Sequence, residues 1–252
     1  MSRQQMRLPD FIGIGVPKAG TSWLARCIDE HHSLTIPKKE THFFSRDTEY
    51  HKGVAYYSRY YASVDKASLA GEFSPNYFAA PHALDRISKH CSEVKLVLVL
   101  RNPVDRTLSH YKHRLLWGQE QHKSTPSPHE YDIDHPIILN SLYGQNITRW
   151  LSGFDRSRFH IVFYEEMVRD PQAAVRALFT FLEVDPDYVP QSIQLRINER
   201  RSIRSHRLER LINWTSKTLA SSGQYRAQKR IANTGWIRRL RQLNESSKQK
   251  VP

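Results

Sequence analysis

The sequence Asp10-Phe-Ile-Gly-Ile-Gly-Val-Pro-Lys-Ala-Gly-Thr-Ser-Trp23 joins a continuous apolar run to a loop of small residues. The apolar run, residues 10–16, predicts a buried β-strand, because it is short, unbroken and followed by turn-forming residues. From Trp23 to Ile28 the apolar residues recur at helical spacing. The stretch therefore predicts a strand, a short loop and a helix in direct succession.

The loop between this strand and this helix predicts an anion-binding site. Small residues at a helix N-terminus bring backbone N–H groups together at the positive end of the helix dipole. Gly20 lets the backbone approach a phosphate closely, Lys18 adds a cation, and Thr21 and Ser22 add hydroxyl donors. The alternative is a glycine-containing turn without a chemical role. The nucleoside triphosphatase pattern G-x-x-x-x-G-K-[ST] is not met, since the lysine precedes the second glycine.

Two further strand–helix units follow along the chain. The apolar runs at 94–100 and 159–164 predict buried strands, and each precedes a segment of helical spacing, about 104–117 and about 171–182. The polar residues 118–136 predict a mobile surface loop. Strands that alternate with helices are typical of a parallel sheet covered on both faces. The sequence therefore predicts an α/β protein with a central parallel sheet flanked by helices.

The second strand is followed by a candidate for another phosphate contact. Arg101 stands at the carboxyl end of this strand, where open α/β sheets bind their ligands. Ser109 comes eight residues later, within the next helix, so a guanidinium fork and a hydroxyl could serve one phosphate. Helix capping accounts for Asn102, Pro103 and Asp105, but it gives no reason for an arginine at the strand end. An arginine where nucleoside triphosphatases hold Mg²⁺ with an aspartate disfavours metal-assisted triphosphate chemistry.

The composition favours one ordinary globular domain and excludes several classes of protein. The chain has 252 residues, 39% of them hydrophobic and 11% aromatic, which is enough for a sizeable core and far from a disordered composition. No apolar run is long enough for a transmembrane helix, and no secretory signal precedes Asp10. Two cysteines predict a reducing, cytoplasmic setting rather than a disulfide framework. No Cys/His cluster with metal-ligand spacing is found, so we expect no metal site.

The positive charge is concentrated in the last quarter of the chain. Residues 196–252 hold 15 of the 38 Lys and Arg residues and 3 of the 25 Asp and Glu residues, which leaves 23 and 22 in residues 1–195. A solvated basic face and an anionic partner are equally good explanations of this segment. We expect a single domain over 1–252, with its core at about 10–205 and a basic helical part at about 206–252.

Five segments in the same order resemble sulfotransferases that use 3′-phosphoadenosine 5′-phosphosulfate (PAPS). Residues 15–23 resemble their 5′-phosphosulfate loop, and residues 100–111 resemble their 3′-phosphate motif. Three more resemble the heparan sulfate branch: Lys39-Glu-Thr-His-Phe-Phe44, Gly71-Glu-Phe-Ser-Pro-Asn-Tyr77 and Tyr143-Gly-Gln-Asn-Ile-Thr-Arg-Trp-Leu151. The resemblance implies a P-loop-like three-layer sandwich and a PAPS-dependent sulfotransferase of the bacterial, soluble type.

The resemblance also implies which residues hold the cosubstrate. It assigns the 5′-phosphosulfate to the loop, and Trp23 to the side of the adenine: Lys18, Ala19, Gly20, Thr21, Ser22 and Trp23. It assigns the 3′-phosphate, which distinguishes PAPS from ATP and ADP, to Arg101 and Ser109. Lys18 would also stabilise the charge that develops on the leaving phosphate of 3′,5′-bisphosphoadenosine (PAP). No metal takes part.

The general base is implied by the segment at 39–44. Glu40 matches the glutamate proposed as the base in heparan sulfate sulfotransferases, where it takes the proton of the acceptor hydroxyl as that hydroxyl attacks sulfur in line. His42 matches an assisting histidine and competes for the same role, because histidine titrates in a useful range without any shift. Apart from the resemblance, both could be polar residues next to the apolar pair Phe43 and Phe44.

The chain departs from the heparan sulfate pattern at two points. Phe73 stands where many of those enzymes have a lysine near the reacting centre, so a second cation is missing or comes from elsewhere. Their late lysine–glycine–tyrosine loop has no clear counterpart, and Arg200, Arg201 and Arg204 are the substitutes that position and charge suggest.

The function predicted from the sequence is sulfuryl transfer from PAPS to an acceptor hydroxyl. A carbohydrate is the first choice of acceptor, and a tyrosyl protein, a lipid or a small natural product are the alternatives. A P-loop kinase of small molecules is a rival reading, which the misplaced lysine disfavours. A nucleic-acid-binding protein is another, for which Tyr225 and Trp236 among the C-terminal arginines are thin support. We therefore expect no nucleic acid as a partner.

Overall fold

Five parallel strands form one sheet in the part of the chain that the computed structural model describes, residues 6–120 and 130–195. They are β1 (Phe11–Gly15), β2 (Leu34–Thr35), β3 (Leu69–Phe73), β4 (Lys95–Leu100) and β5 (Phe159–Phe163). Their order in the sheet is β2-β3-β1-β4-β5, and every neighbouring pair is parallel. The predicted α/β class with a central parallel sheet is therefore confirmed.

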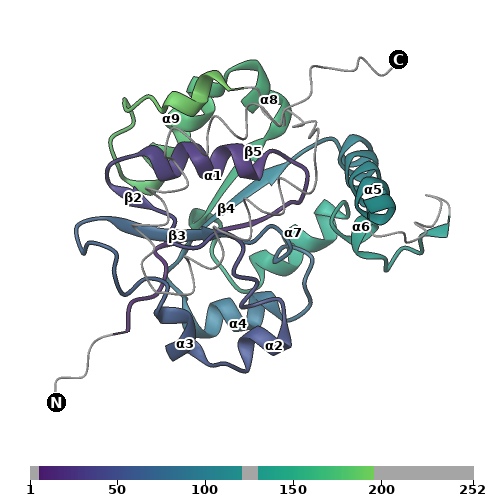
Figure 1. The fold of residues 1–252 in the computed structure, drawn as a ribbon, viewed down its shortest axis with the longest axis horizontal. Coiled ribbons are helices and arrows are strands. Elements are labelled where there is room, and N and C mark those ends of the chain that lie inside the picture. The colour runs from purple at the N-terminus through teal and green to yellow at the C-terminus, as the bar shows by residue number, and fades with distance from the viewer. Residues whose placement is uncertain (1–5, 121–129, 196–252) are drawn as a thin grey trace. The chain divides into compact units, whose positions relative to one another are not determined.

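Helices cover both faces of this sheet. They are α1 (Thr21–Glu30), α2 (Asp47–Tyr50), α3 (Val54–Ser58), α4 (Ala83–His90), α5 (Pro103–Glu120), α6 (Pro136–Leu139), α7 (Tyr143–Leu151), α8 (Tyr164–Arg169) and α9 (Pro171–Leu182), with short 3₁₀ turns η2 (Arg156–Arg158) and η3 (Gln191–Gln194). Helices α1 and α9 lie on one face, and α4 and α7 lie on the other (Figure 1). The result is the three-layer sandwich that the resemblance implies.

The central strand β1 is buried over its whole length, and one glycine in each of β1 and β3 makes room for an aromatic ring of the other strand. A Cβ built on Gly13 would lie 2.1 Å from the Phe73 ring, and one on Gly71 would lie 2.4 Å from the ring of Phe11. The alternation of glycine and apolar residues in β1 is therefore a packing requirement. It also fixes Phe73 as a core residue with no exposed surface.

The three predicted strand–helix units are present with small changes at their ends. The helix after β4 begins at Pro103 and continues to Glu120, so its last turns occupy the start of the predicted surface loop. Strands β2 and β3 were not predicted, since β2 has two residues and β3 contains a glycine and a glutamate. Residues 196–252 lie outside the described part of the chain. The single domain and the basic helical C-terminal part therefore stay predictions.

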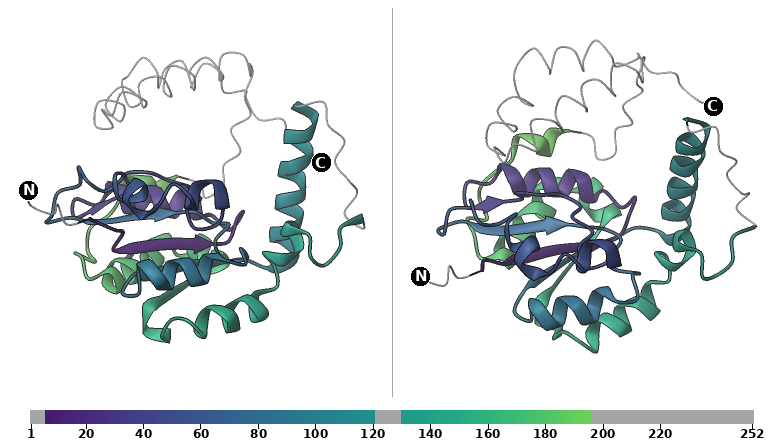
Figure 2. Two further views of the ribbon diagram at one scale, coloured as in Figure 1. Left: turned by 90° about the horizontal axis from the view of Figure 1, so that it is seen from below. Right: turned by 60° about the horizontal axis from the view of Figure 1, so that its bottom comes forward.

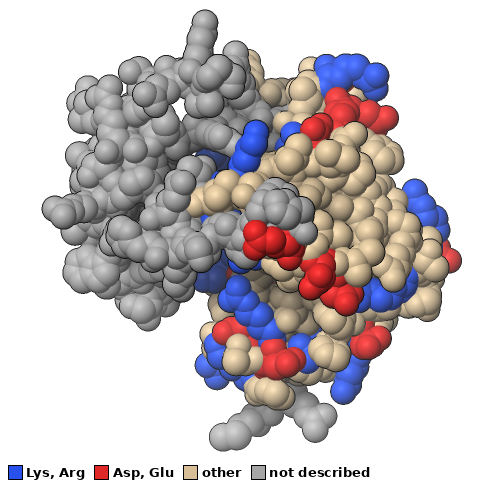
Figure 3. Space-filling view, turned by 90° about the vertical axis from the view of Figure 1, so that its right-hand side faces the viewer, with Lys and Arg blue, Asp and Glu red and all other residues tan. Residues whose placement is uncertain are grey.

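The carboxyl ends of the strands meet at one edge of the sheet, where the functional side chains are expected. Figure 2 shows α5 extending from this edge, beyond the layers that cover the sheet. Lys and Arg side chains are interspersed with Asp and Glu side chains on the face in Figure 3, which agrees with the near balance of charges in residues 1–195. Within the residues described, no helix combines the length and the apolar character that crossing a membrane requires.

Candidate active site

The loop after β1 has the geometry of an anion site. Lys18 and Gly20 both have positive φ, 72° and 89°, and glycine adopts this conformation at no steric cost. Gly20 caps α1, whose first turn carries no acidic side chain and whose first N–H groups have no intrahelical acceptor. Thr21 is buried and Ser22 is exposed. The loop therefore presents a helix dipole, backbone donors and a serine hydroxyl to an anion.

Arg101 joins the end of β4 to this loop. Its Nη1 donates to the carbonyl of Lys18 at 3.3 Å, and its guanidinium stacks over the Tyr164 ring at 4.6 Å. Its Nε is buried and has no hydrogen-bond partner. An unsatisfied buried donor on a charged group is costly, and a bound phosphate would remove that cost. The arrangement suits a phosphate or another oxyanion.

The remaining candidates for cosubstrate binding lie in different surroundings. Ser109 is half-buried and lies on α5, which begins two residues after Arg101. Ala19 has no exposed surface, and its N–H donates within the loop to the carbonyl of Val16. Trp23 is 7% exposed, and its indole donates to the carbonyl of Ser192 at 2.9 Å. The indole therefore already has a structural partner between α1 and η3, and its place beside an adenine stays a prediction.

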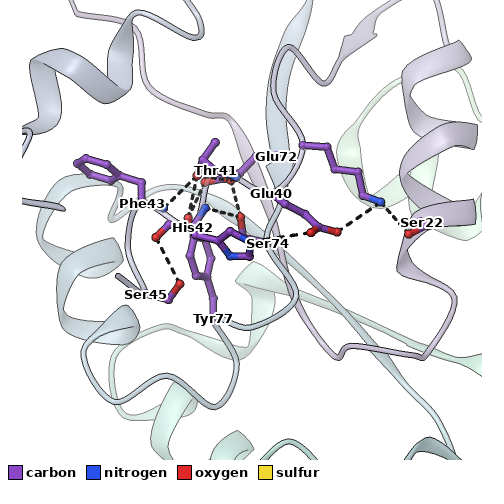
Figure 4. Close-up of polar contacts among 10 residues, drawn as sticks. Ser22, Glu40, Thr41, His42, Phe43, Ser45, Glu72, Ser74 and Tyr77 are labelled. Atoms are coloured by element: carbon purple, nitrogen blue, oxygen red, sulfur yellow. Dashed lines mark hydrogen bonds and ion pairs between the residues drawn. The ribbon is translucent and has the colours of Figure 1, made fainter. Parts of the chain in front are cut away.

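The segment that follows β2 brings Glu40 and His42 to the same edge. Lys39 Nζ donates to Ser22 Oγ at 2.7 Å and lies 3.6 Å from Glu40 Oε1, and Glu40 Oε2 lies 3.9 Å from His42 Nε2 (Figure 4). Glu40 and His42 have positive φ, 57° and 54°. The Glu40 N–H donates to the carbonyl of Phe73 at 2.9 Å, which ties the segment to β3. Lys39 therefore connects Glu40 to the first turn of α1, and His42 lies on the other side of Glu40.

His42 and Glu40 differ in how far they are exposed. The Glu40 side chain is 46% exposed and that of His42 is 15% exposed. The Nδ1 of His42 is buried without a partner. Burial, followed by the charge of Arg46, lowers the pKa of His42 below its ordinary value, so its imidazole is neutral at pH 7. A neutral imidazole can accept a proton at that pH.

Glu72, a fully buried residue on β3, holds the segment 40–42 in place through hydrogen bonds. Its two oxygens accept hydrogen bonds from the Thr41 N–H and from four hydroxyls, those of Thr41, Tyr57, Ser74 and Tyr77, at 2.6 to 3.2 Å. Burial raises the pKa of Glu72, and these hydrogen bonds oppose the shift. Ser74 Oγ in turn accepts from the His42 N–H at 3.2 Å. Glu72 therefore fixes the backbone between Glu40 and His42.

Replacing Glu72 with alanine is expected to lower the free energy of unfolding by about 2–4 kcal/mol, because a cavity forms and several buried donors lose their acceptor. Urea unfolding measures the change. Glu49→Ala is the matched control, since Glu49 pairs with Lys52 on the surface, at 2.7 Å, and such pairs contribute little. A Glu72→Ala protein as stable as the control would show that the hydrogen-bonded cluster does not hold this segment.

Sequence reasoning missed two side chains that shape the phosphate site. Arg106 on α5 has no exposed surface and donates to the carbonyls of Pro17 and Ile137 and to Ser141 Oγ. The Tyr143 hydroxyl donates to the Arg101 carbonyl at 2.7 Å. Both lie within the segments 100–111 and 143–151 that carry the resemblance, so the signal was present. Their positions explain those segments as supports for the loop after β1 and for Arg101.

Two predictions concerned further cations near the reacting centre, and the structure describes only one of the two positions involved. The ring of Phe73 lies in the core against Gly13, so β3 supplies no cation at the position where the heparan sulfate enzymes have a lysine. Arg200, Arg201 and Arg204 lie outside the residues described, and their role as a substitute loop stays a prediction. No cluster of His, Cys, Asp and Glu that could hold a metal is found over 6–120 and 130–195.

The described residues combine a parallel sheet, a phosphate-type loop after its central strand, an arginine after the next strand and a carboxylate at the same edge. This combination is typical of a nucleotide-dependent group-transfer fold. Residues 8–231 match the family model described as the sulfotransferase domain. The chain therefore belongs to the sulfotransferase domain family, and the resemblance stated from the sequence is confirmed.

Similar proteins of known kind include glycan sulfotransferases and bacterial enzymes. Mouse heparan sulfate glucosamine 3-O-sulfotransferase 5 is 30% identical over 190 residues, which cover 71% of this chain and 55% of the mouse protein. Mouse heparan sulfate glucosamine 3-O-sulfotransferase 3B1 is 31% identical over 186 residues, 70% of this chain and 46% of its own. The chain thus spans about half the length of these relatives. The crystal structure of a sulfotransferase from Alicyclobacillus acidocaldarius matches with a TM-score of 0.63 and 27% identity, covering 85% of this chain and 94% of that one.

Proposed function

We propose that this protein transfers a sulfuryl group from PAPS to a hydroxyl of a carbohydrate, with Glu40 as the general base. PAPS supplies the sulfuryl group and, once the group has left, departs as PAP. The acceptor oxygen forms its bond to sulfur as the bond between sulfur and the bridging phosphate oxygen breaks. The proton of the acceptor hydroxyl goes to the carboxylate of Glu40.

The observation that carries this proposal is the contact between Arg101 and the loop after β1. The guanidinium bonds to the Lys18 carbonyl, and its buried Nε has no partner. Two anion sites, one at the N-terminus of α1 and one at Arg101, therefore lie side by side. A nucleotide with phosphates at both the 3′ and 5′ positions matches two such sites, whereas 5′-AMP uses one of them.

The loop holds the 5′-phosphate directly, without a metal ion. The N–H groups at the start of α1 and the hydroxyl of Ser22 bind phosphate oxygens, and Lys18 supplies the compensating charge. The absence of acidic residues from the first turn of α1 favours direct binding of an anion. Binding of PAP without Mg²⁺ is the expected behaviour.

Removing the guanidinium of Arg101 is expected to erase most of the preference for PAP over 5′-AMP. A charge-assisted hydrogen bond to phosphate contributes about 1.5–3 kcal/mol, so Arg101→Ala should weaken PAP binding about 10- to 100-fold and leave the binding of 5′-AMP nearly unchanged. Isothermal titration calorimetry in the presence of EDTA gives both dissociation constants.

Arg101→Lys is the matched control, because it keeps the charge and loses the planar fork. It should bind PAP with an affinity between those of the wild type and Arg101→Ala. If the wild-type protein bound PAP and 5′-AMP equally well, the assignment of PAPS as cosubstrate would fail.

The carbohydrate acceptor is supported by the relatives named as heparan sulfate glucosamine 3-O-sulfotransferases and by the segment from Lys39 to Phe44. Incubation with PAPS and separate panels of oligosaccharides, tyrosyl peptides, lipids and small phenols, followed by mass spectrometry, identifies the acceptor class. We expect sulfated oligosaccharides. Sulfation of tyrosyl peptides alone would replace the carbohydrate and leave the sulfuryl transfer itself in place.

A further inference from the structure

Lys39 lies between the two halves of the candidate site. It follows the short strand β2, and its Nζ contacts Ser22 Oγ at 2.7 Å on one side and Glu40 Oε1 at 3.6 Å on the other. Ser22 belongs to the first turn of α1, where an anion would bind. Glu40 is the candidate base. The ammonium of Lys39 thus connects the group that would hold the phosphate with the group that would take the proton (Figure 4).

The geometry of the reaction places the sulfur atom in the same region. The base must reach the acceptor hydroxyl directly, the hydroxyl oxygen bonds to sulfur, and sulfur is bonded to the phosphate that the loop holds. The transferring group therefore lies between Glu40 and the first turn of α1. Lys39 Nζ is within 4 Å of both sides of this gap.

Two neighbouring positions do not supply a cation to the gap between Glu40 and α1. On β3 the nearest equivalent position is Phe73, whose ring is buried against Gly13. Lys38, one residue earlier, is exposed and directs its Nζ to the Tyr60 ring, 6.0 Å from the ring centre. The side chains of the two consecutive lysines therefore contact different partners, and that of Lys39 contacts the residues of the candidate site.

We propose that Lys39 contacts the transferring sulfuryl group, and that it holds the Glu40 carboxylate in place before the cosubstrate binds. In the free protein the ammonium bridges Ser22 and Glu40. A sulfuryl group between them offers the ammonium anionic oxygens, with which it forms charge-assisted hydrogen bonds. This inference rests on the proposed function and adds a residue that distinguishes PAPS from its product.

The test compares the affinities of PAPS and PAP in the absence of an acceptor, when no turnover occurs. Lys39→Met removes the charge and keeps most of the side-chain volume. We expect it to weaken PAPS binding about 10- to 100-fold, the effect of losing one charge-assisted hydrogen bond, and to leave PAP binding within about twofold of the wild type. Lys39→Arg, which keeps the charge, should retain most of the wild-type preference for PAPS.

Lys38→Met is the matched control and should change neither affinity. Equal weakening of PAPS and PAP in Lys39→Met would overturn the inference, because the lysine would then bind the nucleotide phosphates. Unchanged affinities for both would overturn it as well. Failure of the wild-type protein to bind PAP would reject the proposed function, which separates that failure from a failure of Lys39 alone. Thermal unfolding of each variant confirms that the compared proteins are folded.

Discussion

Lys18→Ala is expected to lower turnover at saturating PAPS about 10²–10³-fold, the usual effect of removing one group that stabilises developing negative charge. The bridging oxygen of the leaving phosphate gains charge as its bond to sulfur breaks. A lysine in the loop after β1 would contact this oxygen most strongly in the transition state. Its contribution therefore falls mainly on turnover and less on binding.

The backbone of Lys18 has an unusual conformation and a fixed partner. Its positive φ of 72° turns the backbone, and its carbonyl accepts from Arg101 Nη1. Burial, followed by the charges of Arg106 and Lys18, lowers the pKa of His110 to about 3. His110 is therefore neutral at pH 7 and adds no positive charge to that of Lys18.

Single-turnover and steady-state rates with PAPS in excess measure the effect, and calorimetry with PAP measures binding. Lys38→Ala serves as the control, since Lys38 is exposed and directed to Tyr60. A Lys18→Ala protein with normal turnover at saturating PAPS would show that this lysine is a binding group only.

The sequence predicted the loop and the strand ends because their signals are local. The apolar run of β1, the glycine at the start of α1 and the arginine after β4 each lie within a few residues of the feature they define. Parallel strands end at a common edge. Short-range patterns therefore sufficed to bring Lys18 and Arg101 together.

The role of Glu72 could not be predicted, since it depends on contacts distant in the sequence. Read alone, Glu72 and Ser74 are typical turn or capping residues. In the structure Glu72 lies in β3 and receives hydrogen bonds from Tyr57, 15 residues earlier, and from Thr41, 31 residues earlier. Tyr57 and Tyr61 are fully buried, and Tyr56 and Tyr60 are half-buried. The Tyr57 hydroxyl donates to Glu72, and the Tyr61 hydroxyl donates to that of Tyr57.

The position of Lys39 was missed for the same reason. Its partner Ser22 lies 17 residues earlier, and the two meet because β2 lies beside β3, which pairs with β1 in turn. The sequence shows that Phe73 stands where the heparan sulfate enzymes have a lysine, so that a cation must come from another residue. It does not show which lysine stands nearest to the first turn of α1.

The choice between Glu40 and His42 as base depends on exposure and contacts. Glu40 is the more exposed of the two and is connected through Lys39 to the anion site. His42 is more buried, and its backbone N–H and its neighbour Thr41 are held by Ser74 and Glu72. An acceptor hydroxyl reaches an exposed carboxylate more easily than a buried imidazole. The difference in exposure therefore favours Glu40 over His42 as the base.

Glu40→Gln is accordingly expected to lower turnover about 10²–10⁴-fold, the range of general-base catalysis, with PAP affinity retained. Glutamine keeps the shape of the side chain and removes its basicity, so a loss of turnover with normal binding isolates proton transfer. His42→Ala should lose less, because the carboxylate remains, and Glu49→Gln serves as a control for the loss of a nearby acidic charge. If Glu40→Gln kept its turnover while His42→Ala lost it, the two roles would be exchanged. The neutral imidazole, whose pKa burial lowers, would then be the group that accepts the proton.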